Sequence, residues 1–462
     1  LPCQPLPLVQ GRRFLFLPRR PFNYGRTVMT NLGDKIEAAR AEAPAEPLSD
    51  VNVIFIQLES FIDPEEIRGL ELSRDAVPNW HALKETSSSG VLTVPVVGAG
   101  TANTECEVLT GMSTRLFGPG EYPYETCLQD QTVESIAYLL QKQGCATHAI
   151  HNHAATFYNR DRVYPHLGFD DFIPLEYMPA AGTTPQNWAK DAVLEGQIRK
   201  ALDATPDQPD FVFTVTVQDH GKYPDEPVLT DPAVTVTACP EEDRRWATEY
   251  YVNQLYETDA FIGRLVEDLE QREEKTVLVL YGDHQPALGL ESGDMAGDSL
   301  FYTEYILWSN FGLEQRQEDL TSYQLSAYVL HCLGITDGIL GAFHQFFREE
   351  PGYLSNLRRI QYDTLYGRRY LTGGQAPYAP TEMEMGVEPI TVTDLYRSGE
   401  VWCIAGENFS PYCRVYADGE ELETVYLSSA LLCLKQDPGE LRPADLEIRV
   451  VDQDGTRLSP EE

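Results

Sequence analysis

The chain has 462 residues, of which 42% are hydrophobic and 10% aromatic, a composition typical of folded proteins rather than disordered ones. Its 72 acidic and 35 basic side chains give a formal net charge of −37. A surface of this charge repels nucleic acid, so we expect no nucleic-acid partner, and an anionic substrate would need a local cation such as a metal ion or a few placed Arg and His side chains.

Residues 1–47 are rich in Pro and Arg and end in an Ala/Glu/Pro stretch, which is typical of a linker or of a short helix before a domain. The sequence has no run of about 18 apolar residues, and the apolar part of its opening stretch is too short for a signal peptide. A chain from which a membrane anchor had been removed would have the same pattern. We therefore interpret residues 1–47 as a linker segment that follows such an anchor.

From residue 48 to 375, short apolar runs alternate with amphipathic segments. This alternation predicts an α/β domain with a mostly parallel central sheet and helices on both faces. Buried strands are expected at 51–57, 145–150, 211–217 and 276–281. Residues 133–144 and 251–272 have apolar positions spaced by three to four residues, which predicts crossover helices.

A polar cluster follows each of the four expected strands. In chain order the clusters contain Glu59, then His151 and His153, then Asp219 and His220, and finally Asp283 and His284. Ligand sites in open parallel sheets lie beyond the carboxyl ends of the strands, so we expect these clusters to converge. The carboxylates and imidazole of Glu59, Asp283 and His284 suit Mn²⁺, Mg²⁺ or Zn²⁺.

The stretch GAGTANTE at 98–105 places Thr101 directly after two glycines and before an apolar run. If a helix begins here, Thr101 lies at its N-terminal end, where free N–H groups favour an anionic phosphate. A nearby metal ion would lower the pKa of the Thr101 hydroxyl and make it a nucleophile. Asn103 would add a donor, Glu105 would be an ordinary capping carboxylate, and Thr104 would lie half a turn further in. An ordinary helix cap is the alternative for Thr101.

The composition and the hydrophobic pattern of the sequence change after residue 375. Residues 376–387 form a Gly/Pro-rich linker, and residues 388–462 are short strands broken by turn signals such as Asp-Gly at 418 and 454. This pattern predicts a small all-β sandwich. The segment also resembles an immunoglobulin-like module of cell-surface proteins, which implies an extracellular location. Nine scattered cysteines without a CxxC pair indicate small core residues rather than a disulfide framework.

Five motifs occur together in the predicted α/β domain, and they read NVIFIQLES, GAGTANTE, HNHAATFYNRDRVYPHLGFDDF, TVQDHGKYP and YGDHQP. In this order and spacing they resemble the lipoteichoic acid synthase family, which are phosphoglycerol transferases of the sulfatase and alkaline phosphatase superfamily. The resemblance covers residues 48–345. It implies an alkaline phosphatase/sulfatase-like fold.

The resemblance also implies a metal site with Thr101 as the nucleophile. The residues that match the family's metal ligands are Glu59, Thr101, Asp283 and His284. The metal is one divalent ion, typically Mn²⁺, with Mg²⁺ and Zn²⁺ as alternatives.

Further positions match contacts to the glycerophosphate headgroup, and they are His151, Arg160 and His220. Tyr158 stands where well-known members have Trp. The GAGT stretch replaces the usual GKT, so a lysine contact beside the nucleophile is absent. These two departures leave the identity of the substrate open.

The implied reaction is a two-step transfer. Thr101 attacks the phosphate of phosphatidylglycerol and releases diacylglycerol, and the glycerophospho-threonine is then passed to a glycan or polyglycerolphosphate hydroxyl, or to water. His220 either transfers a proton or holds a nonbridging oxygen, and Arg160 neutralises charge. The expected location is the extracellular face of a bacterial cytoplasmic membrane, as the soluble part of a membrane-anchored enzyme. The sequence makes no prediction of the oligomeric state.

Several alternatives stay open. A phosphodiesterase or sulfatase-type hydrolase and a phosphoethanolamine transferase belong to the same superfamily. The CxPxR maturation site of formylglycine sulfatases is absent from this sequence. Phosphoethanolamine transferases usually have more zinc ligands than this sequence offers. A non-catalytic cell-surface binding protein is the alternative of another class. At single positions, Arg160 could be a salt-bridged surface residue, His220 a turn histidine, and His153 a structural or rim residue.

Overall fold

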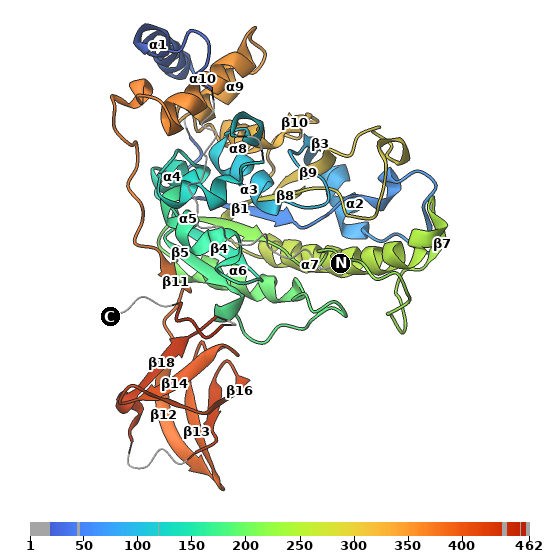
Figure 1. Cartoon of the computed structure of the whole chain (residues 1–462), viewed down its shortest axis with the longest axis vertical. Helices are drawn as coiled ribbons and strands as arrows, with labels where there is room; N and C mark the ends of the chain where they lie inside the picture. Colours follow the sequence, from blue (N-terminus) through green and yellow to red (C-terminus); the bar gives the residue numbers. More distant parts are fainter. Residues whose placement is uncertain (1–18, 44–46, 119, 437–440, 453, 459–462) are drawn as a thin grey trace, which may run out of the picture.

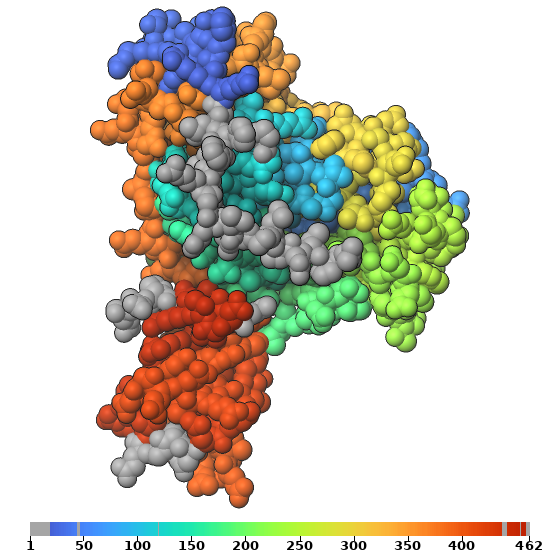
Figure 2. All heavy atoms as spheres, in the orientation of Figure 1, coloured from blue at the N-terminus to red at the C-terminus, as the bar shows by residue number. Residues whose placement is uncertain are grey.

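The computed structural model describes residues 19–43, 47–118, 120–436, 441–452 and 454–458 (Figure 1). A large α/β domain carries a smaller β domain at one end, and helices α1 (Arg26–Glu42) and α10 (Tyr353–Leu365) lie at the opposite end. Figure 2 shows the β domain as a separate lobe below the larger body. None of the described helices combines the length and the apolar character needed to cross a membrane.

The large domain is built on a nine-stranded sheet with the order β10-β3-β9-β8-β1-β6-β4-β5-β11. Its strands are β1 (Val51–Leu58), β3 (Ser88–Thr93), β4 (Ala146–His151), β5 (Asp171–Pro174), β6 (Asp210–Val215), β8 (Lys275–Gly282), β9 (Tyr302–Ser309), β10 (Leu320–Thr321) and β11 (Glu384–Met385). In this sheet, only the pairings of β9 with β8 and β3 are antiparallel. The predicted mostly parallel sheet and its four central strands are confirmed.

Helices cover both faces of the sheet, so the central strands are buried on both sides. In β1, Val53 and Phe55 pack into one core while Ile54 and Ile56 pack into the other. The first core is covered by α1, α3 (Thr101–Thr110), α4 (Ile136–Gln141), α5 (Arg160–Leu167), α8 (Ser322–Cys332), α9 (Leu340–Phe347) and α10. The second is covered by α2 (Pro78–Thr86), α6 (Ala192–Ala204) and α7 (Arg245–Glu270). The expected crossover helices correspond to α4 and α7.

Within residues 1–47, which the sequence predicts as a linker, α1 packs against the large domain. Its buried side chains are Met29, Leu32 and Ile36, spaced by three and four residues so that they share one face of the helix. Residues 1–18 and 44–46 of this segment lie outside the described residues.

The C-terminal region forms two small antiparallel sheets that share one core around Ile404, Val415 and Leu432. One sheet contains β12 (Thr391–Ser398), β13 (Val401–Glu407), β17 (Leu431–Leu434) and β16 (Thr424–Ser428), and the other contains β15 (Glu420–Leu422), β14 (Cys413–Ala417) and β18 (Leu446–Val450). The all-β expectation is confirmed, whereas the immunoglobulin-like assignment stays a prediction. The preceding segment 376–387, predicted as a linker, contributes β11 to the edge of the central sheet.

Polar contacts join the two domains. The Ser410 hydroxyl donates to the carbonyl of Glu176 at 2.5 Å, and Lys200 Nζ lies 3.0 Å from a carboxylate oxygen of Glu388. Within the β domain, Cys403 and Cys433 face each other on β13 and β17 with their Sγ atoms 3.4 Å apart. Every cysteine in the described part of the chain is a free thiol, and Cys3 lies outside it.

Candidate active site

Thr101 is the first residue of α3, as the sequence predicts. The helix is preceded by Gly100, whose φ of 99° lies in the left-handed region that glycine adopts without strain. A Cβ at Gly100 would also lie 3.1 Å from a methyl carbon of Val96. The glycine therefore allows the chain to turn sharply into the helix, and it leaves Thr101 at the N-terminal end where backbone N–H groups are free to bind an anion.

Three potential metal ligands meet beside Thr101. Glu59 follows β1, and Asp283 and His284 follow β8, the neighbouring parallel strand. Because Leu58 and Gly282 are in register, the next residue of each strand emerges at the same edge of the sheet. One ligand atom from each of the three residues lies within 4.8 Å of the others. The Thr101 hydroxyl donates to Glu59 Oε2 at 3.0 Å.

Ser60 orients two of these carboxylates, a role that the sequence analysis missed. Its backbone N–H donates to Asp283 Oδ1 at 2.8 Å, and its hydroxyl donates to Glu59 Oε1 at 2.8 Å. Ser60 adopts a positive φ of 51°, which turns the chain immediately after Glu59. The only signal in the sequence is its place in the LES triplet that ends β1.

The cluster has the properties of a divalent metal site. Asp283 Oδ2 and His284 Nε2 are buried and have no hydrogen-bond partner among the residues that the structure describes. His284 Nε2 lies 3.5 Å from Asp283 Oδ2 and 3.6 Å from Glu59 Oε1, as expected for atoms arranged around a common ligand. Burial raises the pKa of Asp283 to about 7, and the nearby charge of Glu59 adds to the shift. A bound cation would satisfy both unpartnered atoms and offset the repulsion between the carboxylates.

His151 and His220 approach the site from two further strand ends. His151 Nδ1 lies 2.9 Å from the carbonyl of Val215 and must donate to it, so Nε2 is the acceptor of the neutral ring. Burial, together with the charge of Arg160, holds the pKa of His151 well below its usual value. His220 follows β6, and its Nδ1 bonds to the carbonyl of Gly221.

Glu105 is not the capping carboxylate that the sequence predicts. It lies on a helix with every residue buried, and its side chain binds Arg160 of α5 instead of the helix terminus. Arg160 Nη2 donates to Glu105 Oε2 at 2.8 Å, and the hydroxyl of Tyr164 donates to Glu105 Oε1 at 2.7 Å. Arg160 is therefore a buried, fully paired residue rather than the surface arginine that was one alternative.

Tyr158 and Asn103 lie next to these groups. The ring of Tyr158 is 5.5 Å from Arg160 Cζ, and burial raises the pKa of its hydroxyl to about 12. The side chain of Asn103 is in the first turn of α3, and its Oδ1 is buried with no hydrogen-bond partner in the described ranges. Asn103 Oδ1 is thus unpartnered within the described structure, two residues after Thr101, and Tyr158 stacks on the guanidinium of Arg160.

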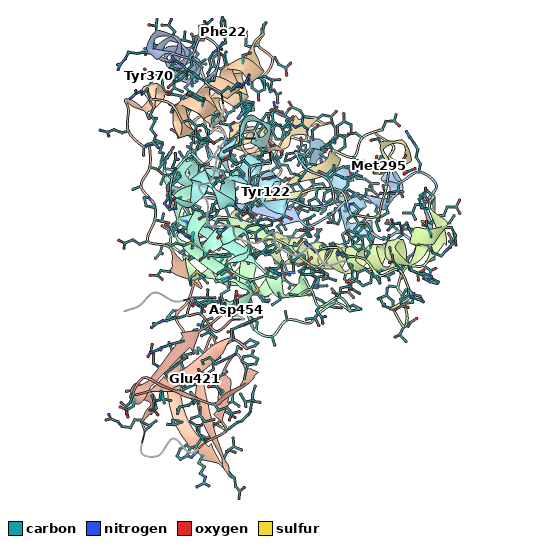
Figure 3. The ribbon with its side chains drawn as sticks, in the orientation of Figure 1. Phe22, Tyr122, Met295, Tyr370, Glu421 and Asp454 are labelled. Atoms are coloured by element: carbon teal, nitrogen blue, oxygen red, sulfur yellow. The ribbon has the colours of Figure 1, made fainter. Side chains whose placement is uncertain are left out.

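A continuous arc of aromatic rings runs from this region to His220. The contacts are Tyr122 with Tyr158 at 6.2 Å, Tyr158 with Phe157 at 4.6 Å, Phe157 with His153 at 4.8 Å, His153 with Trp188 at 5.6 Å, and Trp188 with His220 at 4.3 Å between ring centroids. Figure 3 labels Tyr122, near the middle of the large domain. His153, expected as a structural or rim residue, is half-buried within this arc, and burial lowers its pKa to about 4. Trp188 was not anticipated, because no motif contains it.

Asp219, which precedes His220 in the QDH triplet, is not part of the cluster of Glu59, Asp283 and His284. Its carboxylate accepts a hydrogen bond from Thr258 at 3.0 Å, and the same hydroxyl bonds to Asp191 at 2.9 Å. Burial raises the pKa of Asp219 well above its usual value, and the charge of Asp191 adds to the shift. This buried carboxyl pair supports the loop that carries His220.

The sequence of this chain is similar to those of several known proteins. A sequence model of the Sulfatase family matches residues 51–335. A putative cyclic beta-1,2-glucan modification protein of Rhizobium meliloti is 28% identical over 398 residues, which cover 77% of this chain and 61% of that protein. A lipoteichoic acid synthase of Staphylococcus aureus is 24% identical over 176 residues, covering 37% of this chain and 26% of that protein. This chain therefore spans less than two thirds of the length of either relative.

Among solved structures, the phosphoglycerol transferase GacH of Streptococcus pyogenes in complex with sn-glycerol-1-phosphate has a TM-score of 0.68 at 21% identity. The match covers 79% of this chain and 100% of that chain, and it confirms the fold of the large domain. Together with the sequence relatives, it confirms the resemblance that the five motifs predict.

Proposed function

This chain belongs to the sulfatase family, and on that premise we propose that it is a metal-dependent phosphoglycerol transferase with Thr101 as its nucleophile. One observation carries the proposal: the Thr101 hydroxyl lies 3.0 Å from Glu59 Oε2, at a helix N-terminus and beside the unpartnered ligand atoms of Asp283 and His284 within the described structure. A plain helix cap would need neither the two carboxylates nor the imidazole.

Glu59, Asp283 and His284, with Thr101 Oγ1, would hold one divalent ion, for which Mn²⁺ is our first choice and Mg²⁺ or Zn²⁺ the alternatives. Such an ion lowers the pKa of a neighbouring hydroxyl and neutralises charge on a transferring phosphate. Ser60 holds Glu59 and Asp283 in place through the two hydrogen bonds described above.

In the first proposed step, Thr101 Oγ1 forms a bond to phosphorus of a phosphatidylglycerol-type lipid. The bond from phosphorus to the diacylglycerol oxygen breaks, and diacylglycerol leaves with a proton. In the second step an acceptor hydroxyl attacks the same phosphorus, gives up its proton, and Thr101 regains one. His220 either carries these protons or holds a nonbridging oxygen, because it reaches the site from the end of a separate strand, β6.

The headgroup contacts in this proposal are His151, Tyr158, Arg160 and Asn103. The neutral Nε2 of His151 accepts a hydrogen bond from a glycerol hydroxyl, and Asn103 lies in the first turn of the nucleophile's helix. Arg160 is already paired with Glu105, so it does not bind the phosphate through two free N–H groups. It contributes positive electrostatic potential near the phosphate instead. The sn-glycerol-1-phosphate named with GacH supports this choice of headgroup.

For the acceptor we propose a glycan or polyglycerolphosphate hydroxyl. The rhizobial relative is named for modification of a glucan, and the staphylococcal relative for lipoteichoic acid, so their names support these two classes respectively. We also propose that the domain works on the extracellular face of a bacterial cytoplasmic membrane, as the soluble part of an anchored enzyme.

The test is incubation of the purified protein with labelled phosphatidylglycerol and Mn²⁺, with phosphatidylethanolamine as a second donor. Wild-type protein should release diacylglycerol and gain the mass of a glycerophosphoryl group, and Thr101→Ala should do neither. Thr104→Ala is the matched control, because the Thr104 hydroxyl donates to the carbonyl of Asp283 rather than to Glu59, and it should retain the adduct. Equal release by Thr101→Ala would refute the nucleophile, and release from phosphatidylethanolamine alone would point to the phosphoethanolamine alternative.

A further inference from the structure

Positive charge is concentrated at one end of the molecule, on the segment that leads into the first turns of α1 and on α10 with the residues that follow it. Residues 19–33 and 351–381, here called the arginine cap, contain seven arginines and one acidic residue, Asp363. The arginines are Arg19, Arg20, Arg26, Arg358, Arg359, Arg368 and Arg369. The whole chain has 72 acidic against 35 basic side chains, so this balance is the reverse of the average.

Specific contacts join the two segments into one surface. Arg26 Cζ lies 5.2 Å from the ring centroid of Tyr370, in the short helix η9 (Tyr370–Thr372). Arg359 Nε donates to the carbonyl of Phe22 at 3.2 Å, and the hydroxyl of Tyr24 donates to Asp363 at 2.5 Å. Figures 1 and 3 show this surface at the end opposite the β domain, with Phe22 and Tyr370 labelled.

The charge of the cap is not neutralised within the protein. Among the residues that the structure describes, none of the seven arginines forms an ion pair with a carboxylate, whereas Arg68 and Arg264, on other parts of the surface, each do. Asp363 is 1% exposed, and its oxygens accept hydrogen bonds from Tyr24, Tyr370 and Leu371. The cap therefore presents guanidinium groups that have no carboxylate partner in the described structure, and five of them, those of Arg19, Arg20, Arg26, Arg358 and Arg368, belong to exposed residues.

The cap also holds the most exposed large hydrophobic side chains in the described structure. Phe22 is 84% exposed and Leu354 is 64% exposed. Side chains of this kind beside unpaired arginines are typical of protein surfaces that lie at a membrane interface, where the arginines meet lipid phosphates and the apolar groups enter the acyl boundary. A soluble polyanion would meet the arginines but would leave these apolar side chains in water.

We propose that the arginine cap docks on an anionic phospholipid surface, with its arginines contacting lipid phosphates and with Phe22 and Leu354 inserted between headgroups. The net charge of −37 would repel such a surface from the rest of the molecule, so docking is confined to this end. The inference goes beyond the proposed transfer reaction and does not depend on Thr101 or on a metal ion.

The test is cosedimentation with vesicles of phosphatidylcholine mixed with phosphatidylserine, compared with vesicles of phosphatidylcholine alone. Wild-type protein should bind the anionic vesicles, with affinity that falls as salt rises. Arg358→Glu combined with Arg368→Glu should weaken binding about tenfold or more, because two positive charges that attract an anionic membrane become negative. The control is Arg397→Glu with Lys275→Glu, which makes the same charge change at exposed positions outside the cap and should bind like wild type.

Phe22→Ser with Leu354→Ser should weaken the part of the binding that persists at high salt. The proposal is wrong if wild-type protein binds neither vesicle type, if it binds both equally, or if the cap and control variants lose the same affinity. Binding to soluble polyglycerolphosphate without vesicle binding would also overturn it, in favour of a polyanion. Because phosphatidylserine is not the proposed donor, failure of the transfer reaction leaves this result unaffected.

Discussion

Glu105 and Arg160 form a buried ion pair, with Nη2 of the arginine 2.8 Å from Oε2 of the glutamate. Glu105 lies four residues after Thr101 on α3, and therefore on the same face of that helix. Arg160 begins α5 and follows Tyr158 by two residues. The pair thus ties the helix of the proposed nucleophile to the segment that carries two of the proposed headgroup contacts.

Breaking this pair should destabilise the protein strongly. In Glu105→Gln the guanidinium of Arg160 stays buried without a charged partner, a change that typically costs about 3 to 5 kcal/mol. The free energy of unfolding in urea measures the loss. Lys190→Ala is the control, since Lys190 and Glu257 form a partly exposed pair at 2.8 Å and should contribute about 1 kcal/mol or less. Equal losses in the two variants would show that Arg160 finds another partner.

Removal of the metal should abolish activity and lower thermal stability. A chelator should decrease both, and Mn²⁺ should restore them, because a ligand that binds only the folded state stabilises it by about 2.7 kcal/mol at about 100 times its dissociation constant. Asp283→Asn should lose the metal-dependent rise in Tm, whereas Asp298→Asn, at an exposed residue paired with Arg68, should keep it. Metal content of the purified protein gives a second measurement. An Asp283→Asn protein that binds Mn²⁺ as well as wild type would contradict the ligand assignment.

Trp188 should contribute to binding of the acceptor rather than to cleavage of the donor. Its ring lies 4.3 Å from that of His220 and 5.6 Å from that of His153, within the arc of aromatic side chains described above. Aromatic faces with nearby polar groups suit the apolar face and hydroxyls of a sugar ring. We expect Trp188→Ala to raise the KM for a glycan acceptor about tenfold, which is about 1.4 kcal/mol, and to change diacylglycerol release into water less than that. Trp246→Ala, at a 40% exposed residue on α7, is the control.

Much of the active site could be predicted because its signals are local in the sequence. The strands β1 and β8 are continuous apolar runs, and each is followed by the polar residues that form the candidate metal site. The helix that begins at Thr101 follows from its preceding glycines. Since parallel strands share their carboxyl edge, convergence of Glu59 with Asp283 required no knowledge of side-chain geometry.

The remaining features depend on contacts between segments far apart in the chain. Glu105 sits where a capping carboxylate is common, and only the packing of α5 against α3 reveals that it binds Arg160. Trp188 lies in a loop without regular periodicity, so its contact with His220 has no sequence signal. The packing of α1 likewise has no sequence signal, because its short apolar stripe is also compatible with a linker. Only its contact with α9 shows that the stripe is buried.

The stability of the large domain should fall as the pH rises above neutrality, because of His148 in the central strand β4. Its Nδ1 lies 2.7 Å from Asp171 and its Nε2 lies 3.2 Å from Asp210, both in neighbouring strands. Burial lowers the pKa of His148, but the two carboxylates outweigh burial and raise it to about 9. The unfolded chain has a histidine pKa of about 6.5. The stabilisation is therefore complete below about pH 6.5 and is lost as the pH rises through about 9, a change of about 3 kcal/mol.

Urea unfolding between pH 6.5 and pH 9.5 checks this prediction. Wild-type protein should lose stability across the interval. His148→Gln, which carries no titratable ring, should be less stable than wild type at pH 6.5, and its free energy of unfolding should depend less on pH. His166→Gln is the matched control, because His166 is partly exposed and bonds only to the carbonyl of Arg162 in the described structure, so it should retain the wild-type slope. A wild-type stability that stays constant from pH 6.5 to 9.5 would mean that His148 is neutral and donates to one carboxylate only, so that the other carboxyl group would have to be protonated and donate to the second ring nitrogen.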